Sequence, residues 1–239
     1  MPRARELYDQ ACEGGNADGC FDAGIMFYRG EGGEQDLTRF RPLMSAACKG
    51  GIASGCYLFG HSLYSGLFGP RNMQRARELY DQACQGGHAE ACNDLAYMFN
   101  YGQGGELDKR QARDTYELGC KNGFAESCPS AAVMFKDGVG GQEDKSQARV
   151  LYEEGCVQGN ADSCVSAGLM FLLGRGGEVD RGRARTLFEQ GCELGDAGGC
   201  YQVGAIYLSG QGGAADETKA AEYFTRACAG GYADACPSQ

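Results

Sequence analysis

The sequence has no long apolar run and comparatively few basic residues. Its longest nearly apolar stretch, Ala167 to Gly174, is far shorter than the roughly 18 to 20 residues that a membrane-spanning helix needs, so we expect no membrane span. Lys and Arg together number 22 against 32 Asp and Glu. This deficit argues against nucleic acid as a partner, because phosphate backbones are bound by clustered basic side chains. The net charge of −10 favours a cationic partner.

Histidine is scarce, and the first residues lack the apolar core of a signal peptide. Met1 to Glu6 runs directly into charged residues. The two histidines, His61 and His88, are too few to complete conventional zinc sites with the cysteines. A redox site would need a Cys-x-x-Cys motif beside a sheet, and no segment alternates between apolar and polar residues as a strand does. The sequence also shows no nucleophile grouped with a base. We therefore expect no metal, no cofactor and no catalytic residue.

The most informative feature present is a set of 14 cysteines with a fixed period. They occur in pairs eight residues apart, and the pairs recur every 36 residues without insertion. Such a period indicates a solenoid of stacked repeats. We predict one all-α domain over residues 1–239, a right-handed α/α solenoid of about 13 helices. Its expected units are six repeats and a partial one, at residues 1–36, 37–72, 73–108, 109–144, 145–180, 181–216 and 217–239.

Each repeat is expected to contain two helices. In the first helix of the fifth repeat, Ala148, Leu151 and Tyr152 have the spacing of one buried helix face. Acidic residues stand where these first helices should be capped, at Asp108, Asp144, Asp180 and Asp216, with Gln111 and Gln147 three positions later. The opposite face, which carries Arg77 in the third repeat, is expected to be solvated.

The second helix of each repeat is expected to pack closely on its neighbours and to end in a glycine turn. Glycine or alanine recurs at one inward position, and a Met followed by an aromatic residue, such as Met98 and Phe99, is expected to fill the core. The Gly-x-Gly-Gly segments that follow lack the Lys-Ser/Thr of a phosphate loop. We interpret them as helix caps and turns with positive φ angles.

A disulfide within each cysteine pair accounts for the even count, the spacing and the sevenfold repetition. Each bond closes a loop of about nine residues, worth roughly 2.5 kcal/mol, and seven of them favour an extracytoplasmic location, periplasmic or secreted. Buried free thiols in a cytoplasmic solenoid are the alternative, which the missing signal peptide leaves open. The expected bonds are Cys12–Cys20, Cys48–Cys56, Cys84–Cys92, Cys120–Cys128, Cys156–Cys164, Cys192–Cys200 and Cys228–Cys236.

The repeat pattern resembles a known family. The stretch from Ala76 to Gly105 reads A-x-x-L-Y-x-x-A-C, then G-x-A-x-x-C, then M-F and G-x-G-G. This pattern resembles the Sel1-like repeat, a relative of the tetratricopeptide repeat. The cysteine pairs resemble the Helicobacter cysteine-rich proteins in particular, which implies a bacterial protein with disulfides from one repeat to the next. The resemblance covers essentially the whole chain and implies a protein- or peptide-binding scaffold.

Some cysteine-rich members of that family are linked to binding peptidoglycan or β-lactam-like ligands, with weak β-lactam hydrolysis. A secreted factor that binds cell-wall ligands, with at most weak hydrolase activity, is therefore the alternative function. The sequence has no Ser-x-x-Lys or Lys-Thr-Gly signature, so this association transfers poorly.

Exposed positions that vary between repeats are the best candidates for binding. In solenoids of this kind the second helix of each repeat lines a concave groove, and Tyr is a common interface anchor. We expect a protein or extended peptide to lie there, in the first three repeats. Leu169 and Leu172 of the fifth repeat are equally consistent with packing. The predicted partner-binding residues are Phe21, Ile25, Tyr28, Tyr57, His61, Tyr64, Tyr97, Asn100 and Tyr101.

The second repeat and the chain ends depart from the pattern. Phe40 and Pro42 replace an Ala and a charged residue, and the loop carrying Leu67 and Phe68 is apolar. A local bend, a partner contact or sequence drift each accounts for this. Neither end carries a polar capping repeat, so we expect either a longer array or self-association through uncapped ends.

Overall fold

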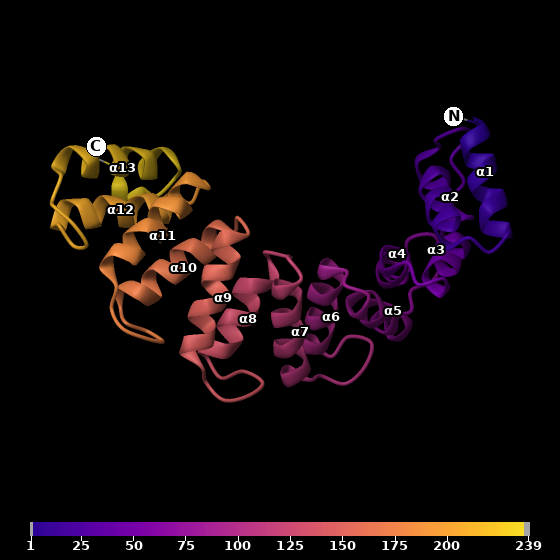
Figure 1. Cartoon of the computed structure of the whole chain (residues 1–239), viewed down its shortest axis with the longest axis horizontal. Coiled ribbons are helices and arrows are strands. Elements are labelled where there is room, and N and C mark those ends of the chain that lie inside the picture. The colour runs from indigo at the N-terminus through magenta and orange to yellow at the C-terminus, as the bar shows by residue number, and fades with distance from the viewer. Residues whose placement is uncertain (1, 237–239) are drawn as a thin grey trace. The chain divides into compact units, whose positions relative to one another are not determined.

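The computed structural model describes residues 2–236, and within that range the chain forms thirteen α-helices and no strand. The all-α prediction is therefore confirmed. Figure 1 shows the helices in chain order, from indigo to yellow. Their bounds are α1 Pro2–Glu13, α2 Ala17–Arg29, α3 Phe40–Lys49, α4 Ala53–Ser65, α5 Met73–Gln85, α6 Ala89–Tyr101, α7 Lys109–Lys121, α8 Ser127–Lys136, α9 Lys145–Val157, α10 Ala161–Leu172, α11 Arg181–Glu193, α12 Ala197–Ser209 and α13 Glu217–Ala229, followed by a short 3-10 helix, η1 Ala233–Ala235.

The helices belong to two compact units, Met1–Asn122 and Gly123–Gln239. Within each unit, every helix packs mainly on the one before and the one after it in sequence. This nearest-neighbour packing is what defines a solenoid, so the predicted α/α solenoid is confirmed. The single-domain organisation with boundaries every 36 residues stays a prediction.

Side-chain caps begin most of the first helices as predicted. The Asp108 carboxylate accepts hydrogen bonds from the backbone N–H groups of Arg110 and Gln111, and Asp144 accepts one from Gln147. Asp180 and Asp216 cap α11 and α13 in the same way. These carboxylates also face the positive end of the helix dipole.

Large aromatic rings of the first helices are buried in both units. Tyr80 of α5 and Phe188 of α11 are 1% and 0% exposed. A Cβ added at Gly60 would lie 3.0 Å from the Tyr80 ring, and one added at Gly168 would lie 2.7 Å from the Phe188 ring. Gly60 and Gly168 therefore make room for an aromatic ring of the next helix, and Gly24 makes room for the Met44 side chain in the same way, which is more specific than the close backbone approach we expected.

The cysteine pairs that the structure describes are disulfide-bonded. Each bond named below starts at the end of a first helix and crosses the turn to the second helix of the same 36-residue unit, except that Cys236 directly follows the short helix η1. Cys120 and Cys128 are disulfide-bonded as well, and no described cysteine is free. The other bonds are Cys12–Cys20, Cys48–Cys56, Cys84–Cys92, Cys156–Cys164, Cys192–Cys200 and Cys228–Cys236.

The Arg77 position was wrongly predicted to be merely solvated. The Arg77 guanidinium lies 4.0 Å from the centre of the Phe99 ring and donates a hydrogen bond of 3.0 Å to the Glu106 carbonyl. Arg149 covers Phe171 in the same way. Phe99 is accordingly half-buried, and it packs against the core on one side and lies beneath an arginine on the other. Arg5, Arg41 and Arg149 likewise donate hydrogen bonds to carbonyl groups of the turn in their own repeats.

The second repeat departs from the pattern in a coordinated way. Its first helix starts late, at Phe40, without a side-chain cap, because the Asp36 carboxylate binds Thr38 instead. Phe68 takes the left-handed turn position, with φ of 67°, that Gly104 takes in the third repeat. At Gly104 a Cβ would lie 2.3 Å from the Met73 carbonyl oxygen. The later helix start in the second repeat leaves room for a side chain.

Candidate functional site

Two neighbouring cavities open along α2, α4 and α6 of the first unit. One has a volume of about 310 Å³ and lies between α4 and α6, and we call it the tyrosine–aspartate cavity. The other has a volume of about 240 Å³ and lies between α2, α3 and α4, and we call it the apolar cavity. His61 lines both, so the two are adjacent on one surface. Volumes of this size are at or below the lower end of ligand pockets.

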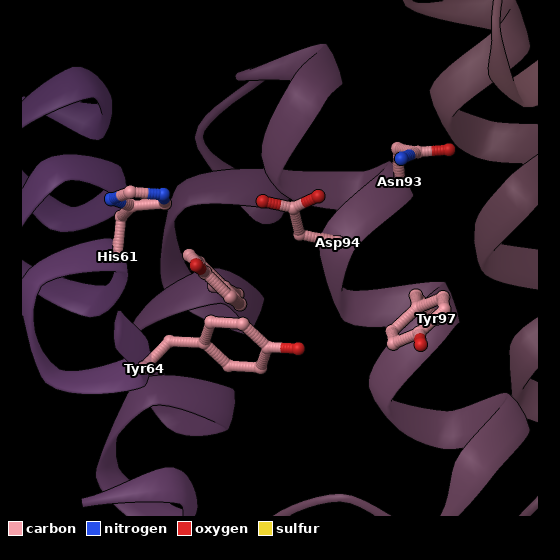
Figure 2. A pocket seen from close by; sticks show the side chains of 6 residues that line it. His61, Tyr64, Asn93, Asp94 and Tyr97 are labelled. Atoms are coloured by element: carbon pink, nitrogen blue, oxygen red, sulfur yellow. The ribbon is translucent and has the colours of Figure 1, made fainter. Parts of the chain in front are cut away.

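The tyrosine–aspartate cavity is lined by aromatic rings around one carboxylate. Figure 2 shows His61 and Tyr64 of α4 on one side, and Asp94 and Tyr97 of α6 on the other. Tyr80 of α5 and Asn93 complete the lining. Tyr97 is 41% exposed, whereas Tyr80 is almost fully buried, so the cavity extends from solvent to the core.

The Asp94 carboxylate is partly desolvated. Burial raises its pKa above the ordinary value, as does the nearby Glu90 carboxylate, while Asn93, His61 and the Tyr57 hydroxyl act in the opposite direction. Burial and the Asp94 charge in turn raise the pKa of both Tyr57 and Tyr80. These hydroxyls therefore stay protonated in the physiological range. They act as hydrogen-bond donors rather than as bases.

Tyr57 does not line the cavity but contacts the lining residue Tyr80. Its ring centre is 4.4 Å from that of His88 in a stacked arrangement, and 5.7 Å from that of Tyr80. His88 caps α6, because its Nδ1 accepts a hydrogen bond of 3.3 Å from the Ala91 N–H. Burial lowers the pKa of His88, which favours the neutral form that this cap requires. Both residues therefore support the site without lining it.

Three aromatic side chains form the wall of the apolar cavity. The Tyr28 ring centre is 5.5 Å from that of Phe40 and 5.9 Å from that of Phe68, and the two phenylalanine rings are 5.1 Å apart. Leu67 of the same loop also faces the cavity. The unusual residues of the second repeat are thus packed together. A non-glycine residue held in a left-handed turn commonly marks a functional position.

The predicted partner-binding residues fall into two groups. Five of the nine line a cavity, namely Ile25, Tyr28, His61, Tyr64 and Tyr97. The other four, which are Phe21, Tyr57, Asn100 and Tyr101, line neither. Asn100 is already engaged, since its side-chain and backbone oxygens accept hydrogen bonds from Lys109. Their role in binding stays a prediction.

Eight residues that line the cavities were missing from the predicted partner-binding set: Phe40, Leu58, Ser62, Leu67, Phe68, Tyr80, Asn93 and Asp94. Asp94 and Tyr97 are three residues apart on α6, so helical spacing alone would have grouped them. Phe40 and Phe68 are far apart in sequence, and only the departure of both from the repeat pattern could have linked them. In the second unit, Leu169 and Leu172 are partly buried against the Phe188 cluster, which favours packing over binding there.

Two other classes of site find no support among the described residues. No group of three or more His, Cys, Asp or Glu side chains is placed to hold a metal ion. Within the same range, no helix combines the length and apolarity that a membrane crossing requires.

Comparison with known proteins identifies the repeats. The Sel1 repeat family matches residues 1–16, 17–39, 53–88, 89–124, 130–160, 161–196 and 197–232. A search of curated proteins gave no match. The Sel1 repeat protein of Oxalobacter formigenes has a TM-score of 0.74 and 22% identity, over 96% of this chain and 66% of that one.

Two further structures are similar. A protective antigen of uropathogenic Escherichia coli with the same fold has a TM-score of 0.55 and 22% identity, over 97% of this chain and 57% of that one. Helicobacter pylori cysteine rich protein B has a TM-score of 0.43 and 24% identity, over 53% of this chain and 90% of that one. This chain thus spans about two thirds or less of the first two structures. Because the family matches most of its length, the chain belongs to the Sel1 repeat family.

Proposed function

We propose that the protein is a binding scaffold that holds an extended segment of another protein along α2, α4 and α6. The observation that carries this proposal is the pair of adjacent cavities that share His61. Tyr28 and Tyr97 border them and are 44% and 41% exposed. Exposed tyrosines beside preformed cavities are typical of interface anchors, because a rigid ring loses little entropy when it is covered.

Selection from a random peptide library displayed on phage, against the oxidised protein, tests this function. We expect enriched peptides whose binding is lost in the double variant Tyr64→Ala with Tyr97→Ala, while helicity by circular dichroism is retained. Tyr8→Ala is the matched control, because Tyr8 is also exposed, at 40%, but lies on α1 away from the cavities. Binding that survives the double variant would remove the groove from consideration.

We further propose that the scaffold acts without catalysis and in an oxidising compartment. The Sel1 repeat is a scaffold fold, and the bonded cysteine pairs are compatible with an extracytoplasmic location. Nitrocefin should not be hydrolysed. Sustained turnover after repurification would contradict the proposed lack of catalysis. Protein isolated from its native source should resist alkylation until it is reduced. Alkylation of its cysteines without prior reduction would contradict the proposed oxidising compartment.

A further inference from the structure

The tyrosine–aspartate cavity has the chemical character of a cation site. Its lining contains the rings of Tyr64, Tyr80 and Tyr97, the carboxylate of Asp94, and the side chains of His61 and Asn93, but no Lys or Arg. Aromatic faces attract cations through the ring quadrupole, most strongly where water is partly displaced. The Tyr64 and Tyr80 ring centres are 6.3 Å apart and tilted by 43°, so the two rings present different faces to the same space.

Asp94 carries a charge that no Lys or Arg of the described chain pairs with, although Asn93 and the Tyr57 hydroxyl hydrogen-bond to it and His61 lies nearby. None of the ion pairs among the described residues includes Asp94. It lies in the middle of α6, so it does not serve as a helix cap. A partly desolvated carboxylate that forms no ion pair is unfavourable. A cation arriving from outside would relieve this.

We propose that this cavity binds an arginine side chain of the segment held in the groove, an inference that rests on the proposed function. A guanidinium group can stack on a tyrosine face while it donates two parallel hydrogen bonds to one carboxylate. The lysine ammonium group is compact and strongly hydrated, so it stacks less favourably on the tyrosine rings. The neighbouring apolar cavity then accepts an apolar side chain close to that arginine in the same segment.

The test uses Nα-acetyl-L-argininamide as the probe and two-dimensional NMR of the full, oxidised chain. We expect saturable shifts of the Asp94 and Tyr97 amide signals. The citrulline analogue has the same shape without the charge, and it should bind at least about tenfold more weakly. Equal binding of the two compounds would overturn the proposal.

Substitutions separate charge from ring. Asp94→Asn should weaken binding of the probe by about tenfold or more, whereas Asp22→Asn should leave the binding unchanged. Asp22 is the matched control, because it occupies the same repeat position on α2 but lines neither cavity. Tyr97→Phe should retain binding and Tyr97→Ala should weaken it. Unchanged affinity in Asp94→Asn would contradict the assignment.

The outcomes distinguish this inference from the function on which it rests. Displayed peptides that depend on Tyr64 and Tyr97, but show no enrichment in arginine, would leave the groove in place and remove the arginine site. Conversely, probe binding that depends on Asp94, without any groove-dependent peptide, would leave the cation site and remove the scaffold function.

Discussion

The two units share one repeat template but differ in the side chains on their second helices. Counting two repeats onward from the tyrosine–aspartate cavity, the positions of Tyr64, Asp94 and Tyr97 are occupied in the second unit by Lys136, Ser166 and Leu169. A cation thus replaces a ring, and the carboxylate is gone. Lys136 pairs with Asp137, and Leu169 packs on the Phe188 cluster. The second unit therefore has no counterpart of the proposed cation site.

The buried residues beneath these surfaces are equivalent in the two units. Tyr80 and Phe188 fill equivalent core positions against Gly60 and Gly168, and equivalent arginines cover Phe99 and Phe171. Positions that stacking requires are thus held constant, and exposed positions are free to vary. We conclude that the difference between the units is one of binding chemistry rather than of architecture.

The largest expected effect tests whether the framework really is equivalent. Replacing Cys84 and Cys92 by alanine in the first unit, or Cys156 and Cys164 in the second, removes a bond across the same sequence separation of eight residues. Each double variant should lose about 2.5 kcal/mol of unfolding free energy by the chain-entropy argument. Urea denaturation measures both. Losses that differ by more than about 1 kcal/mol would show that the frameworks are not equivalent.

A smaller effect is expected where the ring contacts differ. Gly168→Ala brings a methyl group to 2.7 Å from the Phe188 ring, whereas Gly60→Ala brings one to 3.0 Å from Tyr80. Overpacking should cost Gly168→Ala about 1 to 3 kcal/mol, partly offset by the better helix propensity of alanine. Gly60→Ala should be closer to neutral. Thermal unfolding checks the order, and a larger loss in Gly60→Ala would reverse our view of the two contacts.

The parts of the fold that repeat could be predicted from sequence. Cysteine spacing gave the repeat length, and acidic residues such as Asp108 marked helix starts that the structure confirms. Each of these depends on neighbours in sequence or on a regularity seen several times. The contact between Arg77 and the Glu106 carbonyl also has counterparts in other repeats. The sequence could not predict it, because a charged residue on a helix surface does not indicate a hydrogen bond to a carbonyl 29 residues away.

The candidate site was less predictable because its contacts are particular to one place. Exposed tyrosines could be selected by helical spacing, but the contact between Tyr28, Phe40 and Phe68 depends on a late helix start and on a left-handed turn at Phe68. Asp94 matters because of its burial beside Tyr80, which spacing does not show. Such details require the packed structure.

Transferring the cation site would sharpen the comparison further. In a chain that already carries Asp94→Asn, the changes Lys136→Tyr, Ser166→Asp and Leu169→Tyr place the three missing groups in the second unit, where Tyr152 stands at the Tyr80 position. We expect Nα-acetyl-L-argininamide to bind about tenfold more tightly than to the Asp94→Asn background, in line with one charge-assisted contact. Chemical-shift changes of the α10 amide signals measure this binding.

The control for this transfer omits Ser166→Asp and keeps both tyrosines. It should fail to gain affinity, since rings alone do not supply the carboxylate. If the complete set of changes also gains nothing while the chain stays folded, the three groups are not sufficient, and the lining residue His61, whose place Val133 takes in the second unit, would have to be part of the site.

The smallest expected effect concerns the cap of α6. His88 caps α6 through its neutral imidazole, while Asn160 caps α10 at the same repeat position with an amide that does not titrate. Burial lowers the pKa of His88 below the ordinary value of 6.5. The unfolded chain therefore binds the proton more readily, so the stability that this cap contributes is present above about pH 6.5 and is lost as the pH falls further.

The variant His88→Asn gives the first unit the cap of the second. Urea denaturation at pH 7.5 and pH 5 should show that the wild-type protein loses up to about 1 kcal/mol more than the variant on acidification, the usual worth of an N-cap. The carboxylates that surround the site, Asp94 and Glu90 among them, titrate in both proteins and cancel in this difference. An equal loss in both would mean that His88 does not need its neutral form to cap α6, and the two caps would then be equivalent.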